Sequence, residues 1–264
     1  MHEFDLARPD SLKAAADRFA AAAEPAYLAG GRTLLPAIKS RLRAPDLLVD
    51  LSAIPGLDAI SHEGDRLWIG AMTRHAKVCT DASVAAAIPS LARLAAGIGD
   101  PQVRNRGTIG GVLANNDPAA DYPAAALALE AIVQTDRAAH AADAYFQGMF
   151  ATALEDGEII TRIGLRVPAR AAYAKFRHPA SRYAVVGVFV ARFADGAVRV
   201  AVTGAGPGVF RWAEAESALA ANWSADAVSG LTLDPEDLNT DIHASADYRA
   251  HLCGVMLAKA ISEA

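Results

Sequence analysis

The sequence is poor in cysteine, and its two cysteines lie far apart at Cys79 and Cys253. This spacing predicts neither a disulfide framework nor a metal site built on paired cysteines. Iron–sulfur clusters need several cysteine ligands, so we expect none in this chain. Any redox chemistry of the protein would therefore depend on an organic cofactor.

Long apolar runs and an excess of basic charge are also lacking. No run reaches the roughly 18 apolar residues that a membrane helix needs. The acidic start of the chain lacks the basic-then-apolar layout of a signal peptide. Because we expect no disulfide framework, a cytoplasmic location is the default expectation. With 25 basic and 30 acidic residues the formal net charge is -5, which argues against nucleic acid as a partner. A hydrophobic content of 53% is sufficient to bury one large domain or two small ones.

Common site signatures are missing as well. The sequence contains neither the G-x-G-x-x-G fingerprint of dinucleotide-binding folds nor a Walker loop. No histidines pair at the spacing of a metal site, as the positions His62, His75, His140, His243 and His251 show. We therefore predict no metal site in this chain and assign no catalytic side chain.

The first of two glycine pairs, Gly30-Gly31, stands between a short apolar strand expected at 26–29 and a helix expected at 34–42. Glycine lacks a Cβ atom, so backbone N–H groups can close on a large anion. The pair fits either a phosphate-binding loop, to which the Thr33 hydroxyl would add a hydrogen bond, or a tight strand-to-helix turn. Both readings remain open from these residues alone.

The second pair, Gly110-Gly111, lies in a long polar stretch over residues 100–123. Long polar loops within compact domains are usually functional. Asp117 followed by Pro118 predicts a helix start, with Asp117 as the cap. Asp121, one turn later, can either face a ligand or complement the helix dipole. Two glycine loops in one domain predict a cradle for a doubly anionic group such as a dinucleotide pyrophosphate.

The remaining pattern predicts an α+β protein with a domain boundary near residues 168–172. Ser11 is expected to cap the first helix, and Asp195-Gly196 predicts a hairpin in the second domain. The expected helices are 12–23, 34–42, 90–98, 117–129, 213–220 and 248–261. The expected strands are 26–29, 47–51, 57–60, 66–70, 131–135, 158–167, 185–193 and 198–203.

Three longer segments resemble the FAD-binding medium subunit of molybdenum hydroxylases, the family that includes the flavoprotein subunits of aerobic carbon monoxide dehydrogenase and the corresponding domain of xanthine dehydrogenase. They are Ala29-Gly30-Gly31-Arg32-Thr33-Leu34-Leu35-Pro36, the run from Ile98 to Gly111 through Gly107-Thr108-Ile109-Gly110-Gly111, and Ala114-Asn115-Asn116-Asp117-Pro118-Ala119-Ala120-Asp121-Tyr122-Pro123-Ala124. The resemblance covers nearly the whole chain. It implies a two-subdomain FAD-binding domain of the vanillyl-alcohol oxidase-like type over residues 1–170, followed by a small C-terminal α+β domain over residues 171–264.

The resemblance also implies which residues bind FAD. The first loop would wrap the pyrophosphate, the second glycine segment would contact it, Asp121 would bond the ribose or adenine end, and Ile160 and Lys175 would lie near the flavin. The implied set is Leu28, Ala29, Gly30, Gly31, Arg32, Thr33, Leu34, Leu35, Ile98, Thr108, Ile109, Gly110, Gly111, Asp121, Ile160 and Lys175. Val112 departs from the Asn or Ser common in the family, so we expect backbone donors to compensate. Arg32 would add charge attraction.

Three residues outside the glycine loops have competing interpretations. Lys175 also fits an ordinary lysine at a strand edge, and Tyr183 fits either stacking on a flavin or core packing. His178 precedes Pro179, which favours a turn over acid–base chemistry.

Function follows from the resemblance as an expectation. The chain would be an electron-transfer subunit that binds FAD and receives electrons from a small subunit with two [2Fe-2S] clusters, itself fed by a large subunit with a molybdenum pterin cofactor. The flavin would reduce an external acceptor, NAD, a quinone or oxygen, and the assembly would be a dimer of heterotrimers. The alternatives are a self-contained flavoprotein oxidoreductase of the vanillyl-alcohol oxidase fold and a nucleotide-binding module without redox turnover.

Overall fold

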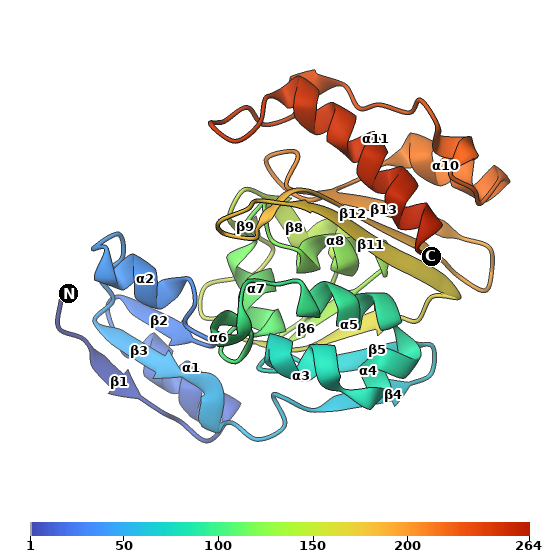
Figure 1. Cartoon of the computed structure of the whole chain (residues 1–264). Helices are drawn as coiled ribbons and strands as arrows, with labels where there is room; N and C mark the ends of the chain where they lie inside the picture. Colours follow the sequence, from blue (N-terminus) through green and yellow to red (C-terminus); the bar gives the residue numbers. More distant parts are fainter. Residues whose placement is uncertain (1) are drawn as a thin grey trace.

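The computed structural model describes residues 2–264 and begins with a small three-layer unit (Figure 1). Its parallel sheet has the strand order β1-β3-β2, and Ser11 caps its first helix by accepting a hydrogen bond from the Ala14 N–H. Apolar residues of both helices pack on this sheet. The elements are β1 (Asp5–Ala7), α1 (Leu12–Ala20), β2 (Pro25–Leu28), α2 (Leu34–Lys39) and β3 (Leu47–Asp50).

A larger subdomain follows, built on an antiparallel sheet of order β4-β5-β10-β6-β7. A short 3₁₀ turn, η1 (Leu51–Ala53), leads into it. The strands are β4 (Ile60–Glu63), β5 (Arg66–Gly70), β6 (Ile132–Thr135), β7 (Ala139–Ala141) and β10 (Ile160–Arg166), with a separate hairpin of β8 (Phe146–Gly148) and β9 (Ala151–Thr152). The helices are α3 (His75–Thr80), α4 (Ala82–Ala87), α5 (Pro89–Ala96), α6 (Pro101–Arg104), α7 (Ile109–Asn115), α8 (Tyr122–Ala128) and α9 (Ala142–Tyr145).

The C-terminal part is a four-stranded antiparallel sheet that is covered on both faces (Figure 1). Alternate residues of its second strand point to opposite sides, so Phe189 joins the core of the preceding subdomain while Val188 and Val190 pack with the last helix. The elements are β11 (Arg170–Arg177), β12 (Ala184–Arg192), β13 (Val198–Thr203), β14 (Phe210–Arg211), α10 (Ala213–Ala221) and α11 (Ala246–Ser262), with 3₁₀ turns η2 (Asp226–Val228) and η3 (Pro235–Asp237).

These elements confirm the predicted α+β class and correct several boundaries. The helix expected at 117–129 begins only at Tyr122, because Asp117 closes a turn by accepting the Ala119 N–H instead of capping a helix. The first two helices end three residues early, at Ala20 and Lys39. The strand expected at 57–60 lies at Ile60–Glu63.

The described helices also bear on membrane insertion. None of those within residues 2–264 combines the length and apolar character that crossing a bilayer requires.

Candidate functional site

A cavity of about 690 Å³ opens between the N-terminal unit and the larger subdomain. Its volume lies within the usual range of small-molecule and cofactor sites. Most of the residues predicted from the sequence line it: Ala29, Gly30, Gly31, Arg32, Thr33, Leu34, Ile98, Thr108, Gly110, Gly111, Asp121 and Ile160. The fold thus brings together segments that are far apart in the sequence.

The first glycine loop carries a row of uncommitted hydrogen-bond donors. Within residues 2–264, the backbone N–H groups of residues 30–34 have no backbone carbonyl acceptor. Gly31 has a φ of 68°, a left-handed conformation that glycine adopts without strain. Thr33 precedes α2 without making a side-chain capping bond, so its hydroxyl is also uncommitted. Successive N–H groups of this kind, at the start of a helix and on a cavity wall, fit a phosphate or diphosphate.

This loop is held against the segment before the second glycine pair. A Cβ at position 30 would overlap the carbonyl of Arg106 and come within 2.7 Å of the Gly107 Cα. Only glycine therefore fits at position 30, because the two backbones touch there. The close approach fixes the donor row relative to the rest of the cavity wall.

The second glycine pair is not a loop of free donors, and that part of the prediction is wrong. Ile109 and Gly110 form the first turn of α7, and their N–H groups donate to the carbonyls of Thr73 and Ala71 at 3.1 and 2.9 Å. The Thr108 side chain caps the same helix by accepting the Gly111 N–H at 3.2 Å. The pair therefore contributes a helix N-terminus to the cavity, with its donors already engaged.

Gly110 is required for packing. A Cβ there would lie 2.5 Å from the Ala71 Cβ and 2.7 Å from the Ala71 carbonyl oxygen. A bulky residue at this position would therefore disturb the packing of α7 on Ala71. Val112, which departs from the family pattern, lines the cavity without a polar group.

Four predicted residues do not line the cavity. Leu28 and Leu35 lie behind the first loop, where their methyl groups pack against Gly31. Ile109 is buried in the core at 2% exposure. Lys175 stands behind Asp121. Direct contact of these four side chains with a cofactor stays a prediction.

Asp121 and Lys175 form a buried ion pair at 2.9 Å. The two residues thus lie together in one ion pair, and their separate contacts with the adenine and flavin ends of FAD stay predictions. Tyr173 donates its hydroxyl to the same carboxylate at 2.5 Å. Burial raises the pKa of the Asp121 carboxyl, and the contacts with Lys175 and Tyr173 oppose that rise.

Tyr173 was missed by sequence reasoning. Its hydroxyl occupies the space that a side chain at position 187 would need, since a Cβ on Gly187 would overlap it. Gly187 pairs with Lys175 across the sheet, so this glycine in the middle of β12 was the available signal.

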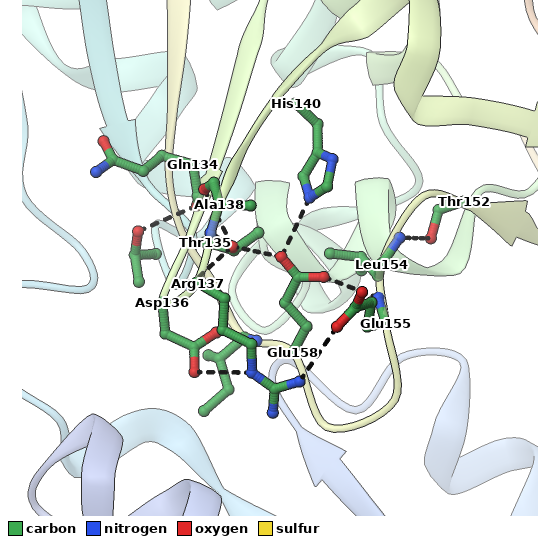
Figure 2. A network of polar contacts seen from close by, with 12 residues as sticks. Gln134, Thr135, Asp136, Arg137, Ala138, His140, Thr152, Leu154, Glu155 and Glu158 are labelled. Carbon is green, nitrogen blue, oxygen red and sulfur yellow. Dashed lines mark hydrogen bonds and ion pairs between the residues drawn. The ribbon is translucent and has the colours of Figure 1, made fainter.

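A separate polar network, shown in Figure 2, surrounds Glu158. The carboxylate of Glu158, also missed, lines the cavity and accepts hydrogen bonds from the Thr135 hydroxyl, the Glu155 N–H and His140 (Figure 2). Burial alone would raise the pKa of Glu158, but these bonds lower it. Ile160 itself pairs with Thr135 across the sheet, where a bulge shifts the register.

Two ring side chains complete the cavity wall. His75 is 2% exposed, and Gly107 leaves room for its ring. Burial and the charge of Arg104 lower its pKa to about 4, so the imidazole is neutral at physiological pH. Tyr183 lines the cavity with its ring half exposed, so it is not a core residue. His178, as expected, shapes a turn, since its Nδ1 accepts the N–H groups of Ala180 and Ser181.

The arrangement fits an elongated ligand with a diphosphate. A row of backbone donors can hold two phosphates, while the buried carboxylates of Asp121 and Glu158 offer acceptors for hydroxyl or amino groups elsewhere along the cavity. FAD has this layout of groups. The residues present therefore fit the cofactor that the sequence predicts.

Comparison with protein families identifies two matching regions. Residues 2–170 match the FAD binding domain in molybdopterin dehydrogenase. Residues 171–264 match the CO dehydrogenase flavoprotein C-terminal domain.

Individual relatives and solved structures agree with these matches. The chain is 36% identical over 258 residues to the carbon monoxide dehydrogenase medium chain of Hydrogenophaga pseudoflava, covering 90% of this chain and 88% of that relative. It is 34% identical to the nicotine 6-hydroxylase medium subunit of Paenarthrobacter nicotinovorans, covering 98% of this chain and 96% of that relative. Among solved structures, quinoline 2-oxidoreductase from Pseudomonas putida 86 superposes with a TM-score of 0.88 at 29% identity, covering 99% of this chain and 96% of that one.

The cavity, the donor row and the sequence relatives lead to one classification. The chain has an FAD-binding domain and is a subunit of an oxidoreductase. It belongs to the FAD-binding medium subunits of the molybdenum hydroxylases.

Proposed function

We propose that this chain is the electron-transfer subunit of its complex and passes electrons from iron–sulfur clusters to an external acceptor. The observation that carries the proposal is the row of uncommitted N–H groups at residues 30–34 on the wall of a 690 Å³ cavity. Bound FAD supplies the two-electron redox chemistry, while the protein binds and orients it and sets the surrounding charge.

The residues of the cavity divide this task. Residues 30–34 hold the diphosphate, and Gly30 keeps them close to the Arg106–Gly107 backbone. Asp121 accepts hydrogen bonds from the cofactor, with its orientation fixed by Tyr173 and Lys175. The exposed Arg32 adds attraction for the phosphates at the rim.

The partners in this proposal are a small subunit with two [2Fe-2S] clusters and a large subunit with the molybdenum pterin cofactor. The names of the relatives support it, because they are medium chains or subunits of dehydrogenase and hydroxylase complexes. We place the assembly, a dimer of heterotrimers, in the cytoplasm. The boundary between the FAD-binding and C-terminal domains falls at residues 170/171, which the limits of the two family matches support.

The substrate belongs to the large subunit. The relatives act on molecules as different as carbon monoxide and nicotine, to judge from their names. The acceptor is NAD, a quinone or oxygen.

The first test is the absorption spectrum of the purified full-length chain. We expect a flavin spectrum with FAD and protein in equimolar amounts. The matched pair Gly31→Ala and Gly64→Ala locates the cofactor, because both glycines have a left-handed backbone, with φ of 68° and 61°. Gly64 lies in a hairpin turn with open space around it, so only Gly31→Ala should lose FAD. Equal FAD content in the two variants would contradict the placement.

The second test separates electron transfer from a self-contained oxidoreductase. The chain is co-purified with its partner subunits, and the reduction of its flavin by candidate substrates is compared with that of the isolated chain. Reduction only in the complex is the expected result. Reduction of the isolated chain by substrate would favour the self-contained flavoprotein.

A further inference from the structure

The N-terminal unit, residues 5–50, is joined to the rest of the molecule by few directed contacts. The chain passes between the two parts once, over residues 51–59 (Figure 1). Within residues 2–264, a single hydrogen bond links residues 2–50 to residues 54–264, from the Tyr27 hydroxyl to the Gly157 carbonyl at 3.1 Å. The ion pairs Arg8–Asp50 and Lys13–Asp17 stay inside the unit. A unit attached in this way can swing as one body on its connection.

Tyr27 is held in position for this hydrogen bond. Its ring stacks on Phe19, with centroids 4.4 Å apart, and both rings belong to the N-terminal unit. Burial and the charge of Asp136 raise the pKa of Tyr27 to about 12, so the hydroxyl keeps its proton. It therefore remains a donor at physiological pH.

The acceptor belongs to the loop before β10 in the larger subdomain. Arg137 donates to the carbonyls of Asp156 and Gly157 at 3.0 and 2.9 Å, which fixes this loop. Gly157 has a φ of 70°, and a Cβ there would lie 3.1 Å from the ring of Phe19. The loop thus fits closely against the N-terminal unit because position 157 has no side chain.

The other contacts across this boundary are packing contacts. Ile159, which is 1% exposed, packs with Ala15 and Val49 of the N-terminal unit. Gly30 touches the backbone of residues 106–107. Separating these surfaces would break one hydrogen bond and expose a small apolar area. Opening of this kind costs less free energy than unfolding the whole chain.

The cofactor cavity lies between the two parts. The donor row of residues 30–34 belongs to the N-terminal unit, whereas Thr108, Asp121 and Ile160 line the cavity from the larger subdomain. Tyr27 is itself part of the cavity wall, so its hydrogen bond stands at the edge of the binding site. A ligand that touches both walls would hold the two parts together.

We propose that the N-terminal unit is a lid that opens on residues 51–59 to admit and release FAD, with the Tyr27–Gly157 hydrogen bond as its latch. The proposal rests on the proposed function, because a diphosphate at residues 30–34 would lie beneath this lid. Gly56 in the connecting segment has a φ of 80° and open space around it, which suits a hinge. The latch joins two protein groups, so it stabilises the closed lid equally with and without FAD.

A latch of this kind has a kinetic signature. When FAD enters and leaves only through the open lid, weakening the latch raises the open fraction of the free and the loaded chain by the same factor. Association and dissociation then accelerate together, and Kd stays unchanged. Removing a hydroxyl that contacts FAD directly would instead speed dissociation alone and raise Kd.

The first test compares Tyr27→Phe with Tyr248→Phe, since Tyr248 is 43% exposed on α11 and lies outside the cavity wall. Flavin fluorescence follows association after FAD is mixed with the cofactor-free full-length chain. The same signal follows dissociation after excess 5-deaza-FAD is added to the loaded chain. We expect both rates to rise about two- to tenfold in Tyr27→Phe, which corresponds to the loss of one neutral hydrogen bond. Kd should not change, and Tyr248→Phe should alter neither rate.

The second test changes the acceptor side of the latch through Gly157→Ala and its control Gly196→Ala. Both glycines have a left-handed backbone, with φ of 70° and 88°, so alanine strains the two positions alike. Only the alanine at position 157 pushes on Phe19, because a Cβ at position 196 meets nothing within 4 Å. We expect Gly157→Ala to speed both rates and Gly196→Ala to leave them unchanged.

The outcomes separate the lid from the proposed function. Unchanged rates in Tyr27→Phe and Gly157→Ala overturn the lid and leave the electron-transfer role intact. Faster dissociation alone, with a weaker Kd, overturns the latch and assigns the Tyr27 hydroxyl to direct contact with the cofactor. A chain that binds no FAD overturns the proposed function itself.

Discussion

Gly110→Ala should destabilise the fold without directly removing a cofactor contact. The added Cβ would lie 2.5 Å from the Ala71 Cβ, about 1 Å or more inside the usual carbon–carbon contact distance. Such overpacking costs about 1–3 kcal/mol. The helix must shift, which weakens the 2.9 Å hydrogen bond from Gly110 N–H to the Ala71 carbonyl, worth about 0.5–1.5 kcal/mol. The higher helix propensity of alanine offsets roughly 0.5–1 kcal/mol of this.

The net loss is therefore about 1–3 kcal/mol in the free energy of unfolding. For a chain of this size each kcal/mol lowers Tm by about 2–4 °C, so the FAD-free variant should melt about 2–12 °C below the unsubstituted protein. Differential scanning calorimetry of cofactor-free protein measures the shift, because bound FAD would add its own stabilisation. Flavin content is measured in parallel.

The neighbouring Gly111→Ala serves as the control. Its Cβ would meet only the Thr108 hydroxyl at 2.9 Å and the Ala29 methyl at 3.5 Å, and a hydroxyl can rotate away. We expect a Tm within a few degrees of the unsubstituted protein. If the FAD-free Gly110→Ala protein has the same Tm as the unsubstituted protein and yet fails to retain FAD, the packing role of Gly110 is refuted. Direct contact between Gly110 and a phosphate of FAD would then be the better explanation.

Three further substitutions test the buried polar groups. Tyr173→Phe removes one donor from the buried Asp121 carboxylate and should lower the free energy of unfolding by about 1.5–3 kcal/mol in urea titrations, with no change for a half-exposed tyrosine as control. His75 has a pKa of about 4 in the fold against 6.5 in the unfolded chain, so the unfolded chain takes up the proton first as the pH falls. The free energy of unfolding therefore decreases by about 3 kcal/mol between pH 6.5 and 4. His75→Gln should make the free energy of unfolding less dependent on pH in this range. The pKa of Glu158 is lowered in the fold, so its ionised carboxylate stabilises the fold at pH values above the ordinary pKa of a glutamate. This stabilisation is lost as the pH falls, so the stability of Glu158→Gln should be less sensitive to acid than that of the unsubstituted protein. An unchanged pH dependence in either of the last two variants contradicts the corresponding assignment.

The first glycine loop could be predicted from the sequence because its signal is local. A short apolar strand, two glycines and a helix start predict a turn with free N–H groups, and residues 30–34 have them. The second pair has the same local composition but different chemistry. Its donors are engaged by the carbonyls of Ala71 and Thr73, which lie almost forty positions away and which no local pattern reveals.

The missed helix start at Asp117 has a similar cause. The Pro118 carbonyl accepts hydrogen bonds from the Gly204 N–H and the Thr203 hydroxyl of the C-terminal sheet. These tertiary bonds hold the segment as a turn, so the helix begins only at Tyr122. Tyr173 and Glu158 were missed for the same reason, because their roles depend on partners on other elements.

The sheet formed by β11 to β14 has consequences for how the whole chain melts. One of its faces completes the core that contains Tyr122, and the other supports the last helix. Removing residues 171–264 would take Phe189 and its neighbours out of that core and expose apolar surface of the FAD-binding part to solvent. Residues 2–170 and 171–264, which match two different family domains, should thus unfold together in one calorimetric transition rather than two.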